Sequence, residues 1–151
     1  MCSTEYPAFP ITAVAGIVFN NNHQVALIKR GAEPRKGQWS IPGGSVETGE
    51  ALHRALVREI REECSLTVTP GPLVNVVERI VHDKQGAVRF HYVILDYVCY
   101  VSGGTLKSGS DAADARWADI ETIESEGLPL NLAHLIQTSH DSYGTADHFM
   151  K

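Results

Sequence analysis

Three glutamates, Glu59, Glu62 and Glu63, are the residues of this sequence whose types and spacing best suit chemistry. On a helix, at about 100° per residue, they fall within one narrow arc, where their like charges repel one another. A divalent cation would neutralise them, and carboxylate oxygens are the ligands that Mg²⁺ and Mn²⁺ prefer. The alternative is a solvated acidic helix face without a ligand, and the spacing taken alone favours that interpretation.

A helix must present these glutamates, and residues 49–64 are predicted to form it. The segment has no proline and is rich in Ala, Leu, Arg and Glu, and Thr48 stands where it can cap the first turn. The apolar residues gather on a separate face that would enter the core. Arg58 is the arginine placed to pair with Glu62 at i+4. This arrangement leaves the carboxylates largely to one another.

Strands and shaped loops surround the predicted helix. Runs of β-branched and aromatic residues are separated by turn-forming residues, and a loop rich in Gly and Pro covers residues 30–45. Pro70 and Pro72 exclude a continuation of the helix. The predicted strands are residues 11–19, 24–30, 39–41, 73–82, 87–101 and 115–118, and the predicted second helix is residues 130–139.

Length and composition indicate one domain over residues 1–151, and the order of the predicted strands and helices indicates an α/β fold. The chain is 43% hydrophobic, which is enough for a core, and its net charge of −5 argues against binding to nucleic acid or anionic membranes. No apolar run is long enough to span a membrane, and the N-terminus lacks the pattern of an export signal. Cys2, Cys64 and Cys99 are odd in number and widely spaced, which is typical of reduced thiols in a cytoplasmic protein.

The segment around the glutamates resembles the Nudix box, which reads Gly, five residues, Glu, seven residues, then Arg-Glu-aliphatic-x-Glu-Glu-x-Gly-aliphatic. From Gly44 this chain runs GSVETGEALHRALVREIREECSL, and the preceding GQWSIPGG is similar to the lead-in of the family. Ser65 departs from the box, because Gly stands at that position in the family and adopts left-handed backbone angles at little cost. The matching residues within 44–66 are Gly44, Glu50, Arg58, Glu59, Ile60, Glu62, Glu63 and Leu66.

This resemblance implies the Nudix fold, a mixed β-sheet sandwiched between helices, with residues 49–64 as the catalytic helix. It also implies a hydrolase that cleaves a pyrophosphate bond with Mg²⁺ or Mn²⁺. The metal ligands carried over are Glu59, Glu62, Glu63 and a backbone carbonyl at Gly43. Arg58 would orient the glutamates, and Glu50 would tie the loop to the start of the helix.

An acidic residue before a tryptophan is a further catalytic candidate by resemblance. Asp111 stands six positions before Trp117 in SDAADARW, where family members use an acidic residue as metal ligand or base. Asp114 lies nearer to the tryptophan. Either aspartate could instead form a turn.

Basic residues provide candidates for binding the phosphates of a substrate. Arg30 and Arg35 flank the loop before Trp39, and Arg79 lies on the paired strands where family members often bind the nucleoside. A solvated surface role is the alternative for each arginine. Trp39 is expected to pack the loop, and His91 and Tyr92 lie on the same strands as Arg79 without a role of their own.

The substrate is predicted to be a small nucleotide. Motifs of the dinucleoside polyphosphate, ADP-sugar and NADH subgroups are absent, and the short chain looks most like members active on ADP-ribose, which would yield AMP and ribose 5-phosphate. Cleavage of nucleoside triphosphates, including oxidised ones, is the alternative. A Nudix module that senses a nucleotide without hydrolysing it is a third hypothesis. Many relatives pair, so the resemblance allows a homodimer.

Overall fold

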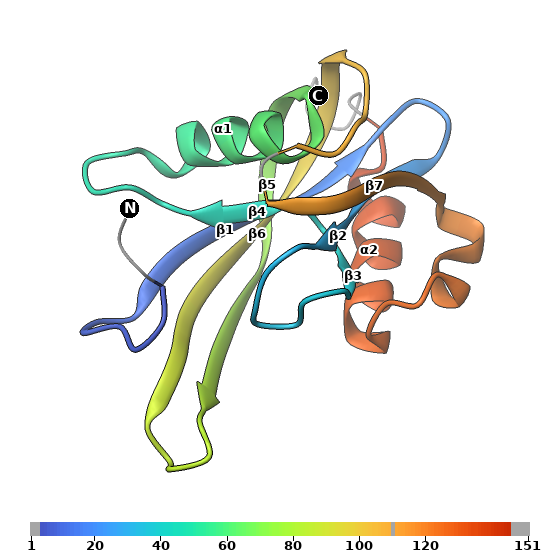
Figure 1. Cartoon of the computed structure of the whole chain (residues 1–151). Coiled ribbons are helices and arrows are strands. Elements are labelled where there is room, and N and C mark those ends of the chain that lie inside the picture. Colours follow the sequence, from blue (N-terminus) through green and yellow to red (C-terminus); the bar gives the residue numbers. More distant parts are fainter. Residues whose placement is uncertain (1–3, 110, 146–151) are drawn as a thin grey trace.

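A mixed β-sheet with helices on both faces forms the protein, and the computed structural model describes residues 4–109 and 111–145. The strand order is β3-β2-β1-β6-β5, with β4 paired to β1 and β7 paired to β2 (Figure 1). The strands are β1 (Ile11–Phe19), β2 (Gln24–Arg30), β3 (Trp39–Ser40), β4 (Gly43–Ser45), β5 (Leu66–His82), β6 (Val88–Gly104) and β7 (Ala112–Asp119). The helices are α1 (Leu52–Cys64), η1 (Ile120–Ser125) and α2 (Leu130–Tyr143).

Strand β1 is the centre of the molecule, because its two sets of alternate side chains enter two cores. It runs parallel to β6 and antiparallel to β2 and β4, which makes the sheet mixed as predicted. Val14 and Val18 belong to the core beneath α1, together with Leu56. Ile17 and Phe19 belong to the core beneath η1 and α2. The predicted α/β layers, with a sheet between helices, are therefore confirmed (Figure 1).

Helix α1 is shorter at its start than predicted. Residues 49–51 lie before its first turn, and its N-cap is Ala51, without a side-chain cap. The prediction that Thr48 caps the helix is wrong, because Thr48 sits in a turn that Gly49 completes with φ of 84°. The other end agrees with the box: Ser65 adopts the left-handed conformation, with φ of 61°, that a glycine would take there.

Strand β5 is longer than predicted, since it begins at Leu66 instead of residue 73. Pro70 and Pro72 lie within it, near register shifts in its pairing with β6. The strand tolerates them because it is at the edge of the sheet, where one side of the backbone needs no partner strand. Strand β4 lies in the segment that was predicted to be a loop. Strand β7 and helix α2 extend beyond the predicted strand 115–118 and the predicted helix 130–139.

The thiols within the described part of the chain are free and buried. Cys64 lies on the buried face of α1, as predicted, and Cys99 lies on β6 beneath it. Cys2 lies outside the described residues. Among the helices that are described, none is both long and apolar enough to cross a membrane.

Candidate functional site

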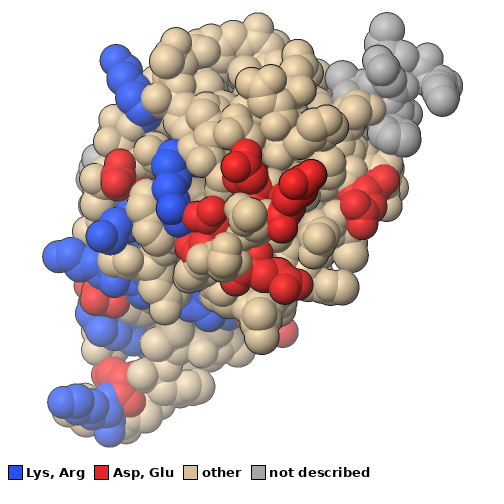
Figure 2. All heavy atoms as spheres, turned by 90° about the vertical axis from the view of Figure 1, so that its right-hand side faces the viewer, with Lys and Arg blue, Asp and Glu red and all other residues tan. Residues whose placement is uncertain are grey.

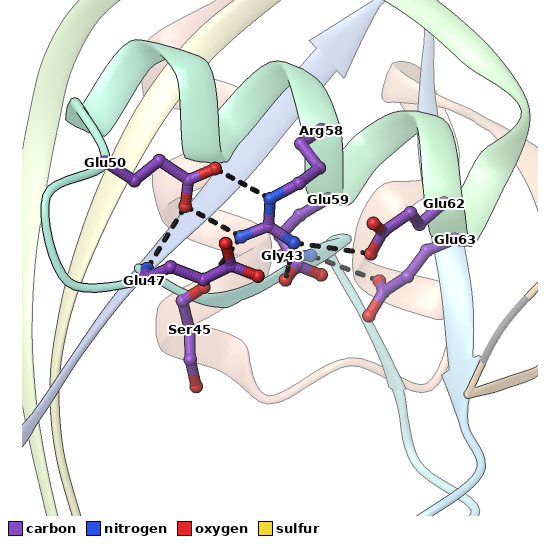
Figure 3. Close-up of polar contacts among 8 residues, drawn as sticks. All are labelled: Gly43, Ser45, Glu47, Glu50, Arg58, Glu59, Glu62 and Glu63. Atoms are coloured by element: carbon purple, nitrogen blue, oxygen red, sulfur yellow. Dashed lines mark hydrogen bonds and ion pairs between the residues drawn. The ribbon is translucent and has the colours of Figure 1, made fainter. Parts of the chain in front are cut away.

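Arg58 is the centre of the polar network on α1 (Figure 3). Its guanidinium donates to both carboxylate oxygens of Glu50, at 2.7 and 2.8 Å, and to Glu59 at 2.8 Å. It also donates to the carbonyl of Ser45 at 3.1 Å and reaches Glu62 at 3.4 Å. One arginine thus joins the start of the helix, strand β4 and two of the glutamates.

The prediction that the glutamates are left largely to one another is therefore wrong. A helical projection could show only the i+4 contact with Glu62, which is the longest of these ion pairs. Glu50 stands before the helix and folds back to Arg58, so the chain reversal supplies the strongest partner. Glu50 also accepts from the Glu47 amide at 3.1 Å, which confirms its expected role as a tie between loop and helix.

Two of the glutamates are sunk against the glycines of β4. The Glu59 carboxylate fills the space where a Cβ at Gly44 would stand, so a side chain there would displace it. The Glu63 Oε2 accepts from the amide of Gly43 at 3.2 Å. These two carboxylates thus pack against the backbone of Gly43 and Gly44, whereas Glu62 is more exposed.

Burial shifts the pKa values of Glu59 and Glu63 away from that of an ordinary glutamate. It raises the pKa of Glu59 despite the neighbouring Arg58, and it raises the pKa of Glu63 to about 7. The Gly43 amide and Arg30 lower the pKa of Glu63, while Glu59 and Asp111 raise it. A partly buried pair of like-charged carboxyls is a functional-site candidate, since holding both of them ionised requires additional positive charge.

The loop before β7 brings Asp111 to the end of α1. The amides of Lys107 and Gly109 each donate to a carbonyl of the last helical turn, at 3.0 Å, and the amide of Gly31 donates to the Asp111 carbonyl at 3.0 Å. These bonds fix Asp111 within electrostatic range of Glu63. Asp114, in contrast, lies within strand β7, where it pairs with Lys29 and accepts from the amide of Ala115 at 2.8 Å, so it does not form the turn that the sequence allowed.

The three candidate arginines, Arg30, Arg35 and Arg79, come from separate parts of the sequence and act on one another electrostatically. Burial lowers the pKa of Arg79, and the positive charges of Arg35 and Arg30 lower it further, so all three lie close together. Arg30 also acts on Glu63 and thereby links the two groups. Figure 2 shows acidic side chains gathered on one face beside a band of Lys and Arg.

The remaining candidates fall on different faces of the sheet. Tyr92 pairs in register with Arg79 and shares its face, whereas His91 points to the opposite face and lies 3.9 Å from Glu78. Trp39 packs against the core beneath α2, with the guanidinium of Arg116 over its ring, as expected for a residue that packs the loop.

Sequence reasoning missed Asp96, a buried aspartate on β6 that is 4% exposed. The Asn75 side chain donates to its Oδ2 at 3.3 Å, and Arg79 acts on it electrostatically. The available signal was a single charged residue inside the apolar run HYVILDYVCY, because a strand that is buried on both faces should carry none.

The donors of the site suit a hard cation that retains part of its water shell. Within residues 4–109 and 111–145, no three His, Cys, Asp or Glu side chains form a ready metal cage. Mg²⁺ commonly uses only one or two carboxylates and completes its shell with water and substrate oxygens. Glu59 and Glu63, which are buried together over two glycines, fit that mode of binding. A groove of about 610 Å³ along the outer side of α1 borders Glu62 alone among the three glutamates.

Comparison with known proteins identifies relatives over most of the chain. The NUDIX domain family model matches residues 10–138. An ADP-ribose pyrophosphatase of Methanocaldococcus jannaschii is 38% identical over 114 residues, which are 76% of this chain and 64% of that protein. The mouse 8-oxo-dGDP phosphatase NUDT18 is 31% identical over 130 residues, which are 82% of this chain and 36% of that protein. The chain thus spans less than two thirds of either relative.

A solved structure supports the fold. The MutT protein from Methanosarcina mazei Go1 superposes with a TM-score of 0.70 at 22% identity, and the match covers 92% of this chain and 99% of that one. At this identity the likeness concerns the fold alone. It agrees with the observed arrangement of the mixed sheet and its flanking helices.

Proposed function

Because the chain belongs to the NUDIX family, we propose that it is a pyrophosphohydrolase that cleaves ADP-ribose to AMP and ribose 5-phosphate. The observation that carries the proposal is the meeting of two charged groups: buried glutamates on one side and three arginines on the other, linked through Glu63 and Arg30. A pyrophosphate with its metal ions is complementary to both groups.

We propose that Glu59, Glu62 and Glu63, with the carbonyl of Gly43, hold Mg²⁺ or Mn²⁺. A bound metal would supply charge neutralisation at the pyrophosphate and an acidified water. The protein provides the orientation, because Arg58 fixes Glu59 and the Gly43 amide fixes Glu63 before any ligand arrives. Asp111, close to Glu63 at the end of the loop, would assist as a further ligand or as the base.

The arginine group would bind the substrate phosphates. Arg30 is held by the carbonyl of Pro34 at 2.7 Å, so its charge is fixed near Glu63. Arg79 and Arg35 have no ion pair within residues 4–109 and 111–145, and their like charges act on each other. An anionic ligand would relieve this repulsion, which is the physical reason to place phosphates there.

A second candidate substrate is an oxidised guanine nucleotide. The supporting observation is the relation to an 8-oxo-dGDP phosphatase, at 31% identity over 82% of this chain. The same glutamates and arginines would serve either reaction, so the groups beyond the phosphates must decide between the substrates. A sensor that binds without hydrolysis is the third candidate, although this chain retains all three glutamates of the box.

Product analysis by ion-exchange chromatography distinguishes these candidates. Purified protein with Mg²⁺ is incubated separately with ADP-ribose, 8-oxo-dGDP, 8-oxo-dGTP, GTP and NADH. AMP with ribose 5-phosphate is the expected result for ADP-ribose. Inorganic phosphate from 8-oxo-dGDP or pyrophosphate from a triphosphate, with ADP-ribose intact, would favour the second candidate. Failure to cleave any member of the panel would contradict the enzyme and favour the sensor.

Glu62→Gln tests the metal assignment without disturbing the fold. Glu62 is the most exposed of the three glutamates, and its contact with Arg58 is long, so the variant should melt like the wild type. We expect turnover to fall at least about 100-fold, since the substitution removes a charged ligand. Glu121→Gln, an exposed residue on η1, is the matched control. Full Mg²⁺-dependent activity in Glu62→Gln would overturn the assignment.

A further inference from the structure

Within residues 4–109 and 111–145, Asp96 is the only charged residue that is fully buried, with 4% of its surface exposed. It lies on β6 and pairs in register with Ala15 of β1 and Asn75 of β5. Removing a carboxylate from water is unfavourable unless partners replace the water. The apolar side chains of the core cannot replace this water, so the burial of Asp96 must have another physical reason.

The protein gives Asp96 only part of that compensation. Asn75 donates to Oδ2 at 3.3 Å, and no described group donates to Oδ1. Arg79 is near enough to lower the pKa of Asp96, but it forms no ion pair with it within 4.0 Å. One carboxylate oxygen thus remains available to accept a hydrogen bond beside an arginine that has no ion pair among the described residues.

The surroundings of Asp96 continue the proposed substrate site. Strand alternation places Asn75, Arg79, Tyr92 and Asp96 on one face of the β5–β6 pair. Electrostatic contacts run in order from Glu63 to Arg30, from Arg30 to Arg79, and from Arg79 to Asp96. A ligand whose phosphates lie between the glutamates and the arginines would extend its other end toward Asp96.

The chemistry at that end excludes another phosphate, because a buried carboxylate repels anions. It calls for a neutral group with a hydrogen-bond donor. The half-buried ring of Tyr92 offers flat apolar surface beside Arg79, and the buried ring of Phe90 lies nearly parallel to it on the same strand, with 16° between the two planes. A flat group that carries N–H donors, as a nucleobase does, fits both features.

We propose that Asp96, held by Asn75, determines base specificity by accepting a hydrogen bond from an N–H donor on the nucleobase edge. The inference rests on the proposed function, whose phosphate site it extends. For an adenine nucleotide the donor is the 6-amino group. Hydrogen bonds to charged acceptors contribute substantially to specificity, since a ligand without the donor leaves the acceptor unpaired.

Binding calorimetry with two ligands that differ in one amino group tests this assignment. ADP and purine riboside 5′-diphosphate share the ribose and both phosphates, and only ADP has the 6-amino donor. Titrations are made with Mg²⁺ at pH 8, where Asp96 is ionised because burial raises its pKa only to about 6. We expect the wild-type protein to bind ADP at least about tenfold more tightly.

The variant Asp96→Asn should lose this preference. Because Asn75 donates to Oδ2, an asparagine at position 96 would keep its carbonyl there and turn its NH₂ toward the ligand. A donor would then meet the 6-amino group, and the ratio of the two affinities should fall to about one or invert. Glu78→Gln, at an exposed residue of the paired strand β5 on the opposite face, is the matched control and should keep the wild-type ratio.

Asn75→Ala protects the test against a folding defect in the buried variant. Asn75 is exposed, so the variant should melt like the wild type, and it should reduce the preference for ADP by releasing the carboxylate. Equal affinities of the wild-type protein for the two ligands, a preference that survives Asp96→Asn, or failure of both ligands to bind would each overturn the assignment. Recognition through the ribose predicts equal affinities.

Turnover is measured separately, so the two proposals can fail separately. A protein that distinguishes the two diphosphates but cleaves no substrate would retain the role of Asp96 and lose the proposed reaction. A protein that cleaves ADP-ribose but binds the two diphosphates equally would retain the proposed reaction and lose the role of Asp96.

Discussion

The glutamates on α1 and the arginines beside them are both clusters of like charge, but the fold treats them differently. Arg58 ties Glu59 and Glu62, and the Gly43 amide ties Glu63, so each carboxylate has a partner within the chain. The side chains of Arg35 and Arg79 have neither a hydrogen bond nor an ion pair within residues 4–109 and 111–145. The acidic cluster is held in place before ligand binding, whereas the arginine group depends on the ligand for its counter-charge.

This difference separates two tasks of one site. Fixed carboxylates can hold a metal ion without reorganising, which concerns the rate of the reaction. Arginines without partners contribute to affinity, because a phosphate relieves their repulsion on binding. Substitutions in the two groups should therefore change different kinetic constants.

Among the substitutions that test this division of tasks, Arg58→Ala should have the largest effect, because it removes the residue that orients the acidic cluster. We expect kcat to fall about 10- to 100-fold with little change in KM, since the partners that orient metal ligands typically matter by that factor. Steady-state kinetics with ADP-ribose measures it. Arg54→Ala, on the exposed side of the same helix, is the control and should keep wild-type kcat. Unchanged kcat in Arg58→Ala would mean that the glutamates orient themselves.

Arg79→Ala tests whether the arginine group contributes to substrate affinity. We expect KM for ADP-ribose to rise about tenfold with a smaller change in kcat, because a charged hydrogen bond to phosphate is lost. The folded protein should not lose stability, since the removed charge faces Arg35 and Arg30. Lys84→Ala at the turn between β5 and β6 is the control. A pure kcat defect in Arg79→Ala would contradict the division of tasks.

Asp96→Asn should change stability in a pH-dependent way. Burial raises the pKa of Asp96 from an ordinary 3.8 to about 6, so the unfolded chain releases this proton at lower pH than the folded one. Wild-type stability therefore falls as pH rises from about 4 to 6, and the variant escapes this loss. Its advantage should grow over that window to about 1–3 kcal/mol and stay constant above it.

Urea denaturation of both proteins at pH 4, 5, 6 and 8 measures this difference. Relative destabilisation of the variant at pH 8 would show that Asp96 is a structural residue whose burial the fold compensates fully. Glu78→Gln, at an exposed position of the same strand pair, is the matched control.

The smallest effect concerns the C-terminal end of α1, which carries Glu62 and Glu63. Ser65 has φ of 61°, and a left-handed conformation costs non-glycine residues more than the added freedom of glycine costs in the unfolded chain. Ser65→Gly should raise the free energy of unfolding by about 0.5 kcal/mol. Urea denaturation checks it, with Ser65→Ala as a control that keeps the strain. Equal stability of the Gly and Ala variants would exclude backbone strain.

Individual residues show how far prediction from the sequence reached. The helix that carries Glu59, Glu62 and Glu63 was predicted because a long segment without proline that is rich in Ala, Leu, Arg and Glu has one strong local preference. The start of β5 was missed because Pro70 and Pro72 are unfavourable in a strand interior, and only the edge position of that strand makes them acceptable. Whether a strand tolerates proline depends on the strands beside it, and rules based on the local sequence do not contain that information.

The sequence by itself determined the spacing of the glutamates, the box from Gly44 to Leu66 and the alternation of the strands, because these depend on neighbours along the chain. Only the tertiary structure decided that Glu50 returns to Arg58, that Arg30, Arg35 and Arg79 meet, and that Asp96 is buried beside them. These contacts join residues distant in sequence. Their partners therefore depend on how the sheet is ordered, which no local pattern records.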